Sequence, residues 1–282
     1  MFQLQALEPV DYLVIGHLTR DITSEGPRLG GTAAYASLTA HALGLRTGVV
    51  TAWGAELPLG PLASVPIASF PTERSTVFEN RPVPDGRIQY VRHVAPGLDF
   101  YHVPEPWRNA SIIHLGPVAQ EVEPSLVRNF PSAFIGVTPQ GWLRTWDQEG
   151  RVSIGEWPEA PFVLGRVGAA VISLEDVGGD EGRIEELASS CHILAVTEAA
   201  HGARLYWNGD VRRFPAPEVE EVDPTGAGDV FAAAFFVRLF TTRDPWESAR
   251  FATLLSAFSV TRPGLSGIPT MEEIEESMLE VF

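Results

Sequence analysis

Residues 223–229 read Asp-Pro-Thr-Gly-Ala-Gly-Asp and lead directly into an apolar stretch at 230–240. Gly226, Ala227 and Gly228 carry little side chain where the chain turns into a predicted helix, so the first unpaired N–H groups can face a bound anion. Asp229 then falls in the first turn, where an acid is ordinary. A simple glycine-rich cap needs one such residue. Two acids that bracket bare backbone donors favour a site that holds a phosphoryl group beside a proton acceptor.

Length and composition indicate a chain with a large core. Of its 282 residues, 45% are hydrophobic, which suits one α/β domain with or without a small appendage. No apolar run reaches the roughly 18 residues of a membrane span, and residues 1–10 lack the pattern of a signal peptide. Cys191 is the only cysteine, which excludes an intrachain disulfide. We therefore expect a cytoplasmic protein with no membrane partner.

The charged residues exclude several classes of function. The formal net charge is -16, which argues against nucleic acid as a partner because nucleic acid needs a concentrated positive field. All 20 basic residues are arginine, and lysine is missing from the chain. P-loop NTPases, protein kinases and pyridoxal enzymes rely on a lysine, so these classes are disfavoured. A protein of this composition that moves phosphate must use backbone N–H groups, arginine and a metal ion.

The pattern of apolar runs predicts an α/β fold. Buried parallel strands are expected at 12–16, 47–51, 111–115, 133–138, 169–174 and 192–197, and helices at 30–43, 227–240, 246–261 and 271–281. Strands at 76–80 and 87–94 read as an exposed hairpin, and 203–207 and 211–214 flank an Asn-Gly turn. The segment 57–71 is rich in proline and stays unassigned. The sequence therefore predicts helices on both faces of a mostly parallel sheet, with a small β structure projecting between about 72 and 103.

The 223–229 stretch and its small-residue helix resemble the C-terminal signature of the PfkB, or ribokinase-like, sugar kinases. The resemblance implies one kinase domain over 1–282, a three-layer α/β/α sandwich, and a β lid at about 72–103 with a contribution from 17–28. It implies that Asp229 is the catalytic base and that the backbone of 226–228 forms an anion hole. It also places Asp223 and Thr225 beside a monovalent cation such as K⁺.

Substrate contacts are expected just after the first strand, because ligands of open α/β sheets gather at the carboxyl ends of strands. Asp21 lies there, and a carboxylate can accept from two adjacent hydroxyls of a polyol. The resemblance implies that the backbone of Gly30 and Gly31 approaches the sugar. Tyr35 stands close to the position where the family often carries asparagine. Gln89 belongs to a segment similar to the lid of inositol-kinase-like members, which favours a cyclic polyol, with a pentose, a ketohexose or a nucleoside as alternatives.

Arg144 is the leading candidate for a cation at the transferring phosphate. It follows a predicted strand in the segment Pro139-Gln140-Gly141-Trp142-Leu143-Arg144, similar to an Asp-Pro-Asn-x-Arg segment of fructokinase-type relatives. The segment Ser173-Leu174-Glu175-Asp176 is loosely similar to the family's magnesium-associated Asn-x-x-Glu. Carboxylate oxygens suit Mg²⁺, so Asp176 or Glu175 is expected near the metal, with Asp223 as a further metal candidate.

The donor nucleotide is expected at the loop between the predicted strand 192–197 and the hairpin that follows it. Thr197-Glu198-Ala199-Ala200-His201-Gly202 matches the family's Thr-x-Gly-x-x-Gly loop at Thr197 and Gly202, with Ala199 in place of the middle glycine. Gly264 lies in a segment similar to the border of the adenine and cation sites. We expect these residues, with Thr225, to contact ATP.

These observations predict an ATP- and Mg²⁺-dependent kinase that phosphorylates a hydroxyl of a sugar, cyclitol or nucleoside. A catalytically silent sugar- or nucleotide-binding member of the same fold is the alternative, and the retained Asp229 argues against it. A dinucleotide-dependent oxidoreductase would need Gly-x-Gly-x-x-Gly after the first strand, which Gly16-His17-Leu18 does not supply. Exposed lid strands would allow a homodimer, whereas a charged edge would keep the chain monomeric.

Overall fold

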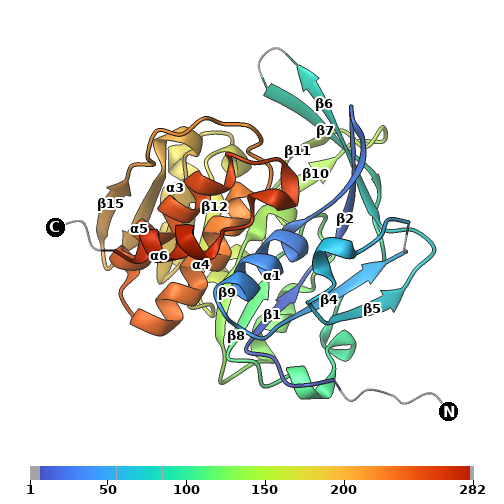
Figure 1. Cartoon of the computed structure of the whole chain (residues 1–282), viewed down its shortest axis with the longest axis horizontal. Coiled ribbons are helices and arrows are strands. Elements are labelled where there is room, and N and C mark those ends of the chain that lie inside the picture. Colours follow the sequence, from blue (N-terminus) through green and yellow to red (C-terminus); the bar gives the residue numbers. More distant parts are fainter. Residues whose placement is uncertain (1–6, 55, 84–85, 280–282) are drawn as a thin grey trace.

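The computed structural model describes residues 7–54, 56–83 and 86–279, and a nine-stranded sheet crosses its centre (Figure 1). The strand order is β15-β14-β13-β12-β9-β8-β1-β4-β5. Neighbouring strands from β13 to β5 run parallel. β14 is antiparallel to β13, and β15 is antiparallel to β14. The strands are β1 Tyr12–Ile15, β4 Thr47–Trp53, β5 Ile67–Pro71, β8 Ile112–Leu115, β9 Phe134–Val137, β12 Ala169–Ser173, β13 Ile193–Thr197, β14 Ala203–Trp207 and β15 Asp210–Phe214.

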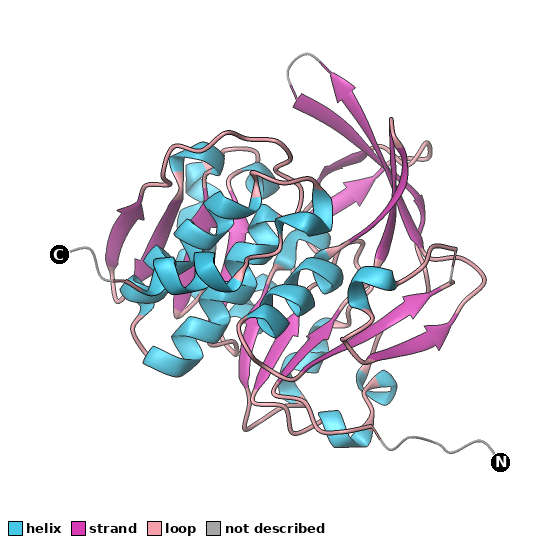
Figure 2. Ribbon diagram, in the orientation of Figure 1, coloured by secondary structure: helices cyan, strands magenta, loops and turns pink. Residues whose placement is uncertain are grey.

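Helices cover both faces of this sheet, as Figure 2 shows. The helices are α1 Thr32–Ala42, α2 Ala160–Leu164, α3 Glu181–Ser190, α4 Ala227–Thr242, α5 Pro245–Ser259 and α6 Met271–Met278. Short 3₁₀ helices occupy several connections: η1 Gly60–Leu62, η2 Phe100–His102, η3 Glu105–Trp107, η4 Pro124–Arg128, η5 Pro139–Gly141, η6 Glu175–Val177, η7 Ala199–His201 and η8 Gly264–Gly267. The observed architecture is an α/β/α sandwich, which confirms the predicted fold class.

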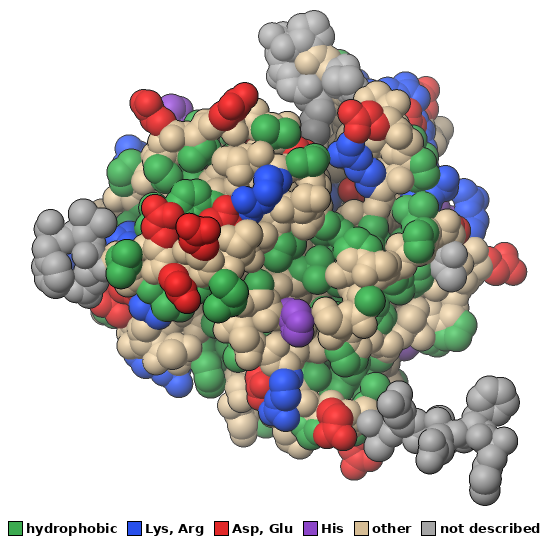
Figure 3. Space-filling model, in the orientation of Figure 1, with side chains coloured by type: hydrophobic (Ala, Val, Ile, Leu, Met, Phe, Trp, Pro, Cys, Tyr) green, Lys and Arg blue, Asp and Glu red, His purple; other side chains and the backbone are tan. Residues whose placement is uncertain are grey.

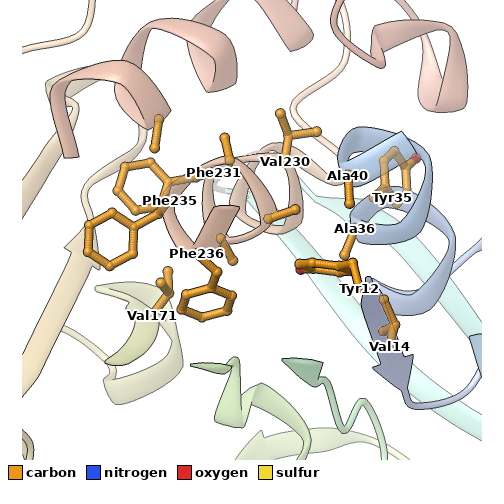
Figure 4. Close-up of a cluster of buried hydrophobic side chains, with 14 of the residues drawn as sticks. Tyr12, Val14, Tyr35, Ala36, Ala40, Val171, Val230, Phe231, Phe235 and Phe236 are labelled. Carbon is orange, nitrogen blue, oxygen red and sulfur yellow. The ribbon is translucent and has the colours of Figure 1, made fainter. Parts of the chain in front are cut away.

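The sheet separates two apolar cores, because successive side chains of a strand point to opposite faces. Tyr12 and Val14 of β1 enter the core that contains α1 and α4, whereas Leu13 and Ile15 enter the other. Figure 4 shows the first core, where phenylalanines of α4 fill the space between β1, β12 and α1. Strands buried on both faces read as continuous apolar runs, which is why the sequence revealed them.

A second, four-stranded sheet has the order β3-β2-β6-β7. Its strands are β2 Thr19–Thr23, β3 Gly26–Gly30, β6 Thr76–Val83 and β7 Gly86–His93. Because β2 follows directly on β1 and pairs in parallel with β6, this small sheet is joined to the central sheet at the carboxyl end of β1. It projects from the body at the upper right of Figure 1. A two-stranded ribbon, β10 Arg144–Trp146 and β11 Val152–Ile154, lies beside it.

The structure contains elements that the sequence analysis did not predict. They are α2, α3, the strands β2 and β3, the ribbon of β10 and β11, and β5, an edge strand parallel to β4 that forms from part of the unassigned segment 57–71. The expected strand at 87–94 ends at His93, and α6 ends at Met278, with 280–282 outside the described residues. Most of these differences fall at element ends or in short, polar or half-exposed segments, where periodicity carries the least information.

Candidate active site

The site is built around the start of α4. Gly226 is the N-cap residue and adopts a left-handed conformation with φ of 84°. A Cβ placed on it would lie 2.2 Å from the ring of Tyr35, so only glycine fits between that ring and the turn. No side chain among the described residues caps this helix start. The Ala227 N–H already donates to the Pro224 carbonyl oxygen at 3.2 Å, so the first-turn donors that could face an anion are those of Gly228 and Asp229.

Asp229 lies in the first turn of α4 and is half-buried. Desolvation raises the pKa of this carboxyl to about 6, against 3.8 for an ordinary aspartate. A hydrogen bond with Thr32 and the charge of Arg144 act in the opposite direction, whereas Asp176 and Asp21 raise the pKa further. The structure thus brings an arginine and two further acids within electrostatic range of a carboxyl whose pKa is raised. A proton acceptor beside a phosphoryl group would require such surroundings.

A cavity of about 430 Å³ lies between the small sheet and the loops before and after the last helices. Asp21, Arg28 and Asn80 line it from the small sheet, and Tyr35 lines it from α1. Thr19 donates its hydroxyl hydrogen to Asp21 Oδ1 at 2.8 Å. The cavity therefore offers carboxylate, amide, guanidinium and phenol groups to a small polar molecule.

The glycine pair brings the backbone close to this cavity. A Cβ on Gly30 would lie 2.3 Å from Asp21 Oδ2, and one on Gly31 would lie 2.5 Å from the carbonyl oxygen of His17. Gly31 also has φ of 87°. Gln89 is one step removed, because it does not line the cavity and instead donates from Nε2 to Asn80 Oδ1 at 2.9 Å. Its place is that of a residue that orients Asn80.

Arg144 begins β10 and reaches back toward the central strands. Its Nη1 donates to the carbonyl oxygen of Val118 at 3.0 Å, and its guanidinium lies 5.4 Å from the ring centre of Phe78 in β6. These contacts hold the cation at the base of the small sheet and within electrostatic range of Asp229. The arginine therefore places a positive charge within electrostatic reach of the carboxyl at the start of α4.

The expected metal residues are only partly brought together. Asp176 Oδ2 accepts a hydrogen bond from the Ser173 N–H at 2.8 Å, and Ser173 Oγ accepts one from the Asp176 N–H at 3.1 Å. Asp223 lies in another group of contacts, and no three His, Cys, Asp or Glu side chains gather as a metal site in the described part of the chain. Asp176 and the neighbouring Glu175 fit a Mg²⁺ ion only if phosphate oxygens and water supply most of its ligands, as this ion commonly allows.

Asp223 fastens the loop before α4 to its surroundings. Its Oδ1 accepts from the Thr225 N–H and its Oδ2 from the Gly264 N–H, both at 3.0 Å, and Arg28 Nη1 lies 3.5 Å from Oδ2. Although desolvation acts in the opposite direction, these hydrogen bonds lower the pKa of Asp223. The carboxylate thus joins β3 of the small sheet to the start of α4, and Thr225 and Gly264 line the same cavity.

The predicted nucleotide loop follows β13 at the same end of the sheet. Thr197 ends the strand and donates to the Ile172 carbonyl oxygen at 3.4 Å. Gly202 has φ of 90°, and a Cβ there would lie 2.0 Å from the Phe214 carbonyl oxygen. Ala199, which replaces a glycine of the resemblance, has φ of 51°. The loop therefore keeps the left-handed turn that glycine favours.

The sequence analysis assigned no site role to Thr32, Arg28 or Asn80, and it noted Tyr35 only as a departure from the family pattern. Thr32 bonds the proposed base, Tyr35 packs on Gly226, and Arg28 and Asn80 line the cavity. The position of Thr32 directly after the glycine pair was a usable signal. The other three depend on contacts between distant segments.

Comparison with known proteins agrees with this geometry. Residues 170–271, which include β12, β13 and the start of α4, match the family described as pfkB family carbohydrate kinase. This match covers just over a third of the 282 residues and includes the glycine-rich start of α4. The fold is shared with solved structures of the ribokinase family, which superpose over 95% or more of this chain at 16–21% identity. No helix in the described ranges is both long and apolar enough to cross a membrane.

Individual PfkB-family and ribokinase-like proteins show where the chain is similar. The inositol 3-kinase of Zea mays is 30% identical over 78% of this chain, and the match spans 58% of the maize enzyme. A pyrophosphate-dependent kinase in the ribokinase family, solved with a pyrophosphate analogue and myo-inositol, superposes with a TM-score of 0.76 at 20% identity, covering 95% of this chain and 100% of that one. A putative ribokinase II of E. coli with ATP and Mg²⁺ has a TM-score of 0.73 at 20% identity, covering 96% and 99%.

Proposed function

We propose that this chain transfers the γ-phosphoryl group of ATP to a hydroxyl of a small polyol, with Asp229 as the general base. The observation that carries the proposal is a carboxyl with a raised pKa in the first turn of an uncapped helix, within range of Arg144. Asp229 accepts the proton of the attacking hydroxyl, the new O–P bond forms, and the bond to the leaving ADP oxygen breaks. A carboxyl with a pKa near 6 is ionised at neutral pH yet remains a useful base.

The charge of the phosphoryl group is balanced by three kinds of partner. The backbone of 226–229 faces it from the helix start, with the N–H groups of Gly228 and Asp229 as donors because the Ala227 N–H is bonded to Pro224. Arg144 supplies a guanidinium, since the chain contains no lysine. Asp176 and Glu175 would hold Mg²⁺ together with phosphate oxygens and water. When bound, the ion supplies positive charge between the phosphates.

The acceptor is proposed to be a cyclic polyol, such as an inositol, held in the 430 Å³ cavity. Asp21 and Asn80 offer the hydrogen-bonding groups that several neighbouring hydroxyls need, and Gln89 orients Asn80. The maize relative is named for inositol, which supports this substrate class. The small sheet, drawn at residues 19–30 and 76–93, acts as the lid that excludes water from the reaction.

The nucleotide is proposed to lie along Thr197, Gly202, Thr225 and Gly264, at the β13 side of the site. A monovalent cation is not needed beside Asp223 in this arrangement. Its oxygens accept two backbone N–H groups, and the Arg28 guanidinium already brings a positive charge. Turnover is therefore expected without added K⁺.

The surface and assembly follow from the same picture. On the face shown in Figure 3, arginine side chains are scattered among acidic ones and do not gather into one positive patch, in keeping with a small-molecule partner.

A homodimer formed through the edges of the small sheet remains the proposal for assembly. Light scattering after gel filtration tests it, because a mass near 30.7 kDa would contradict the dimer.

The decisive experiment is a phosphorylation screen of the purified chain with Mg²⁺ and a panel of inositols, pentoses, ketohexoses and nucleosides. Parallel series contain ATP or pyrophosphate, because superposing kinases use each donor. We expect turnover with ATP and a cyclitol, and its loss in Asp229→Asn. Binding of a polyol without turnover under any condition would favour the silent binding protein, and unchanged turnover in Asp229→Asn would remove the proposed base.

A further inference from the structure

Three side chains of neighbouring central strands form a buried polar chain. Tyr12 of β1 lies with its hydroxyl 2.8 Å from His114 Nδ1 of β8, and His114 Nε2 lies 2.9 Å from Thr138 Oγ1, just after β9. Tyr12 and His114 have no exposed surface, and Thr138 has 7%. Figure 4 shows Tyr12 within the apolar core beneath α4. Polar groups in such a core are costly unless they serve each other or a ligand.

The positions of the hydrogens follow from the partners. Burial lowers the pKa of His114 to about 3, so the imidazole is neutral and carries one hydrogen. Within the described ranges, His114 Nδ1 is the only hydrogen-bond partner of the Tyr12 hydroxyl, so the phenol must donate to Nδ1 to use its hydrogen. The imidazole hydrogen then sits on Nε2 and is donated to Thr138. Thr138 accepts this bond, and its own hydrogen is left to point elsewhere.

Thr138 lies where such a hydrogen is useful. A Cβ built on Gly116 would lie 2.5 Å from Thr32 Cγ2 and 3.4 Å from Thr138 Oγ1, so Thr138 and the threonine that bonds Asp229 both lie beside Gly116. The same residue begins the turn η5, which leads to Arg144. In the strand order, β9 stands between β1, which carries the polyol side, and β12 and β13, which carry the donor side. Thr138 is therefore at the boundary where the phosphoryl group passes.

We propose that Tyr12 and His114 act as positioning residues that hold the Thr138 hydroxyl as a hydrogen-bond donor to the transferring phosphoryl group. The proposal rests on the proposed kinase function and adds an uncharged hydrogen-bond donor to the phosphoryl group. The Thr138 hydroxyl is oriented before the substrate binds, because its oxygen already accepts the hydrogen bond from His114 Nε2. A preorganised donor of this kind stabilises the transition state with little rearrangement.

The first test compares kinetics of Thr138→Val, Thr138→Ser and Tyr12→Phe with the native chain. We expect kcat of Thr138→Val to fall about 10- to 100-fold, with KM for the polyol within about threefold. Thr138→Ser should keep kcat within about threefold, and Tyr12→Phe should lower it less than Thr138→Val does. The control Thr241→Val, at an exposed position of α4, should match the native chain. Unchanged kcat in Thr138→Val would overturn the proposal, as would a rise in polyol KM that leaves kcat unchanged.

The second test is independent of turnover. Nitrogen-15 NMR of histidine-labelled protein should show His114 as the Nε2–H tautomer from pH 5 to 9, and Tyr12→Phe should shift its resonances. The Nδ1–H tautomer in the native chain would overturn the relay even if the protein is a kinase. Native protein that shows the Nε2–H tautomer but no turnover with any polyol would instead count against the kinase function. The two failures are therefore separable.

Discussion

Replacing Asp229 by asparagine should stabilise the fold while it abolishes turnover. The buried carboxyl has its pKa raised from 3.8 to about 6, which means that the folded state disfavours the ionised form. Asparagine has nearly the same shape, keeps an oxygen that can accept from Thr32, and carries no charge. The substitution therefore removes an electrostatic penalty and removes the proton acceptor at the same time.

The size of the effect follows from the pKa change. At about 1.4 kcal/mol for each tenfold change in an ionisation constant, the penalty is about 3 kcal/mol at neutral pH as an upper limit. Because Asp229 is only half-buried, water reduces this value, and a gain of roughly 1–3 kcal/mol is expected in Asp229→Asn.

The stability penalty of the Asp229 carboxyl depends on pH. Below pH 3.8 the carboxyl is neutral in both the folded and unfolded states, so the penalty is absent. It grows as the pH rises through the interval from 3.8 to about 6 and is fully present above that. The native chain should therefore lose stability across this interval relative to Asp229→Asn. Turnover should show the opposite trend, with kcat/KM falling about tenfold per pH unit below pH 6, because the protonated carboxyl is no base.

Urea unfolding at pH 4.5 and pH 7 measures the free energy of unfolding of both proteins, and initial rates measure kcat. Asp210→Asn is the matched control, because Asp210 is exposed on β15, and its stability and turnover should equal those of the native chain. We expect kcat to fall about 10²- to 10⁴-fold in Asp229→Asn. A variant that is no more stable than the native chain at pH 7 would refute the argument from burial, and one that keeps its turnover would refute the assignment of the base.

Four further predictions concern the surrounding site. Gly226→Ala should cost about 2–4 kcal/mol in urea unfolding, because the new Cβ meets an aromatic ring, whereas Gly209→Ala, at φ of 80° in open space, should cost about 1 kcal/mol; equal losses would contradict the clash. Arg144→Gln should lower kcat about 10²- to 10³-fold, and a change confined to KM would exclude its action on the transition state. Asp223→Asn should raise KM for the polyol about three- to tenfold by loosening the small sheet, and an unchanged KM would refute that coupling. Removal of Mg²⁺ by EDTA should stop turnover but leave the melting temperature within about 2 °C, since no three-carboxylate site holds the ion in the described ranges; a large loss of melting temperature would indicate a structural metal.

The elements that the sequence predicted well are those whose patterns are local. The strands buried on both faces are continuous apolar runs, and the helix start at 226–229 combines small residues with an acid in the first turn. The small sheet was less visible. Its strands β2 and β3 are polar and half-buried, so the segment 17–28 shows little periodicity, and its pairing with β6 depends on residues more than 50 positions away.

The details of the candidate site were harder to predict because its contacts cross long stretches of chain. The pairing of Arg28 with Asp223 spans 195 positions, and no pattern in either segment indicates the other. The position of Tyr35 against Gly226 is similar, since the tyrosine reads from the sequence as a residue of an apolar helix. The metal candidates illustrate the converse, because three acids that seemed alike in the sequence lie in different surroundings in the fold.

The sequence by itself determined the chemical repertoire of this protein: an α/β chain without lysine, and a glycine-rich helix start that ends in an acid. Those properties depend on residue type and on neighbours within one or two turns. Only the tertiary structure decided which acid has its pKa raised by desolvation, because desolvation depends on every segment that surrounds Asp229. It also decided the direction of the hydrogen bonds from Tyr12 to Thr138, because a proton's position in a neutral chain follows from partners that the fold brings together.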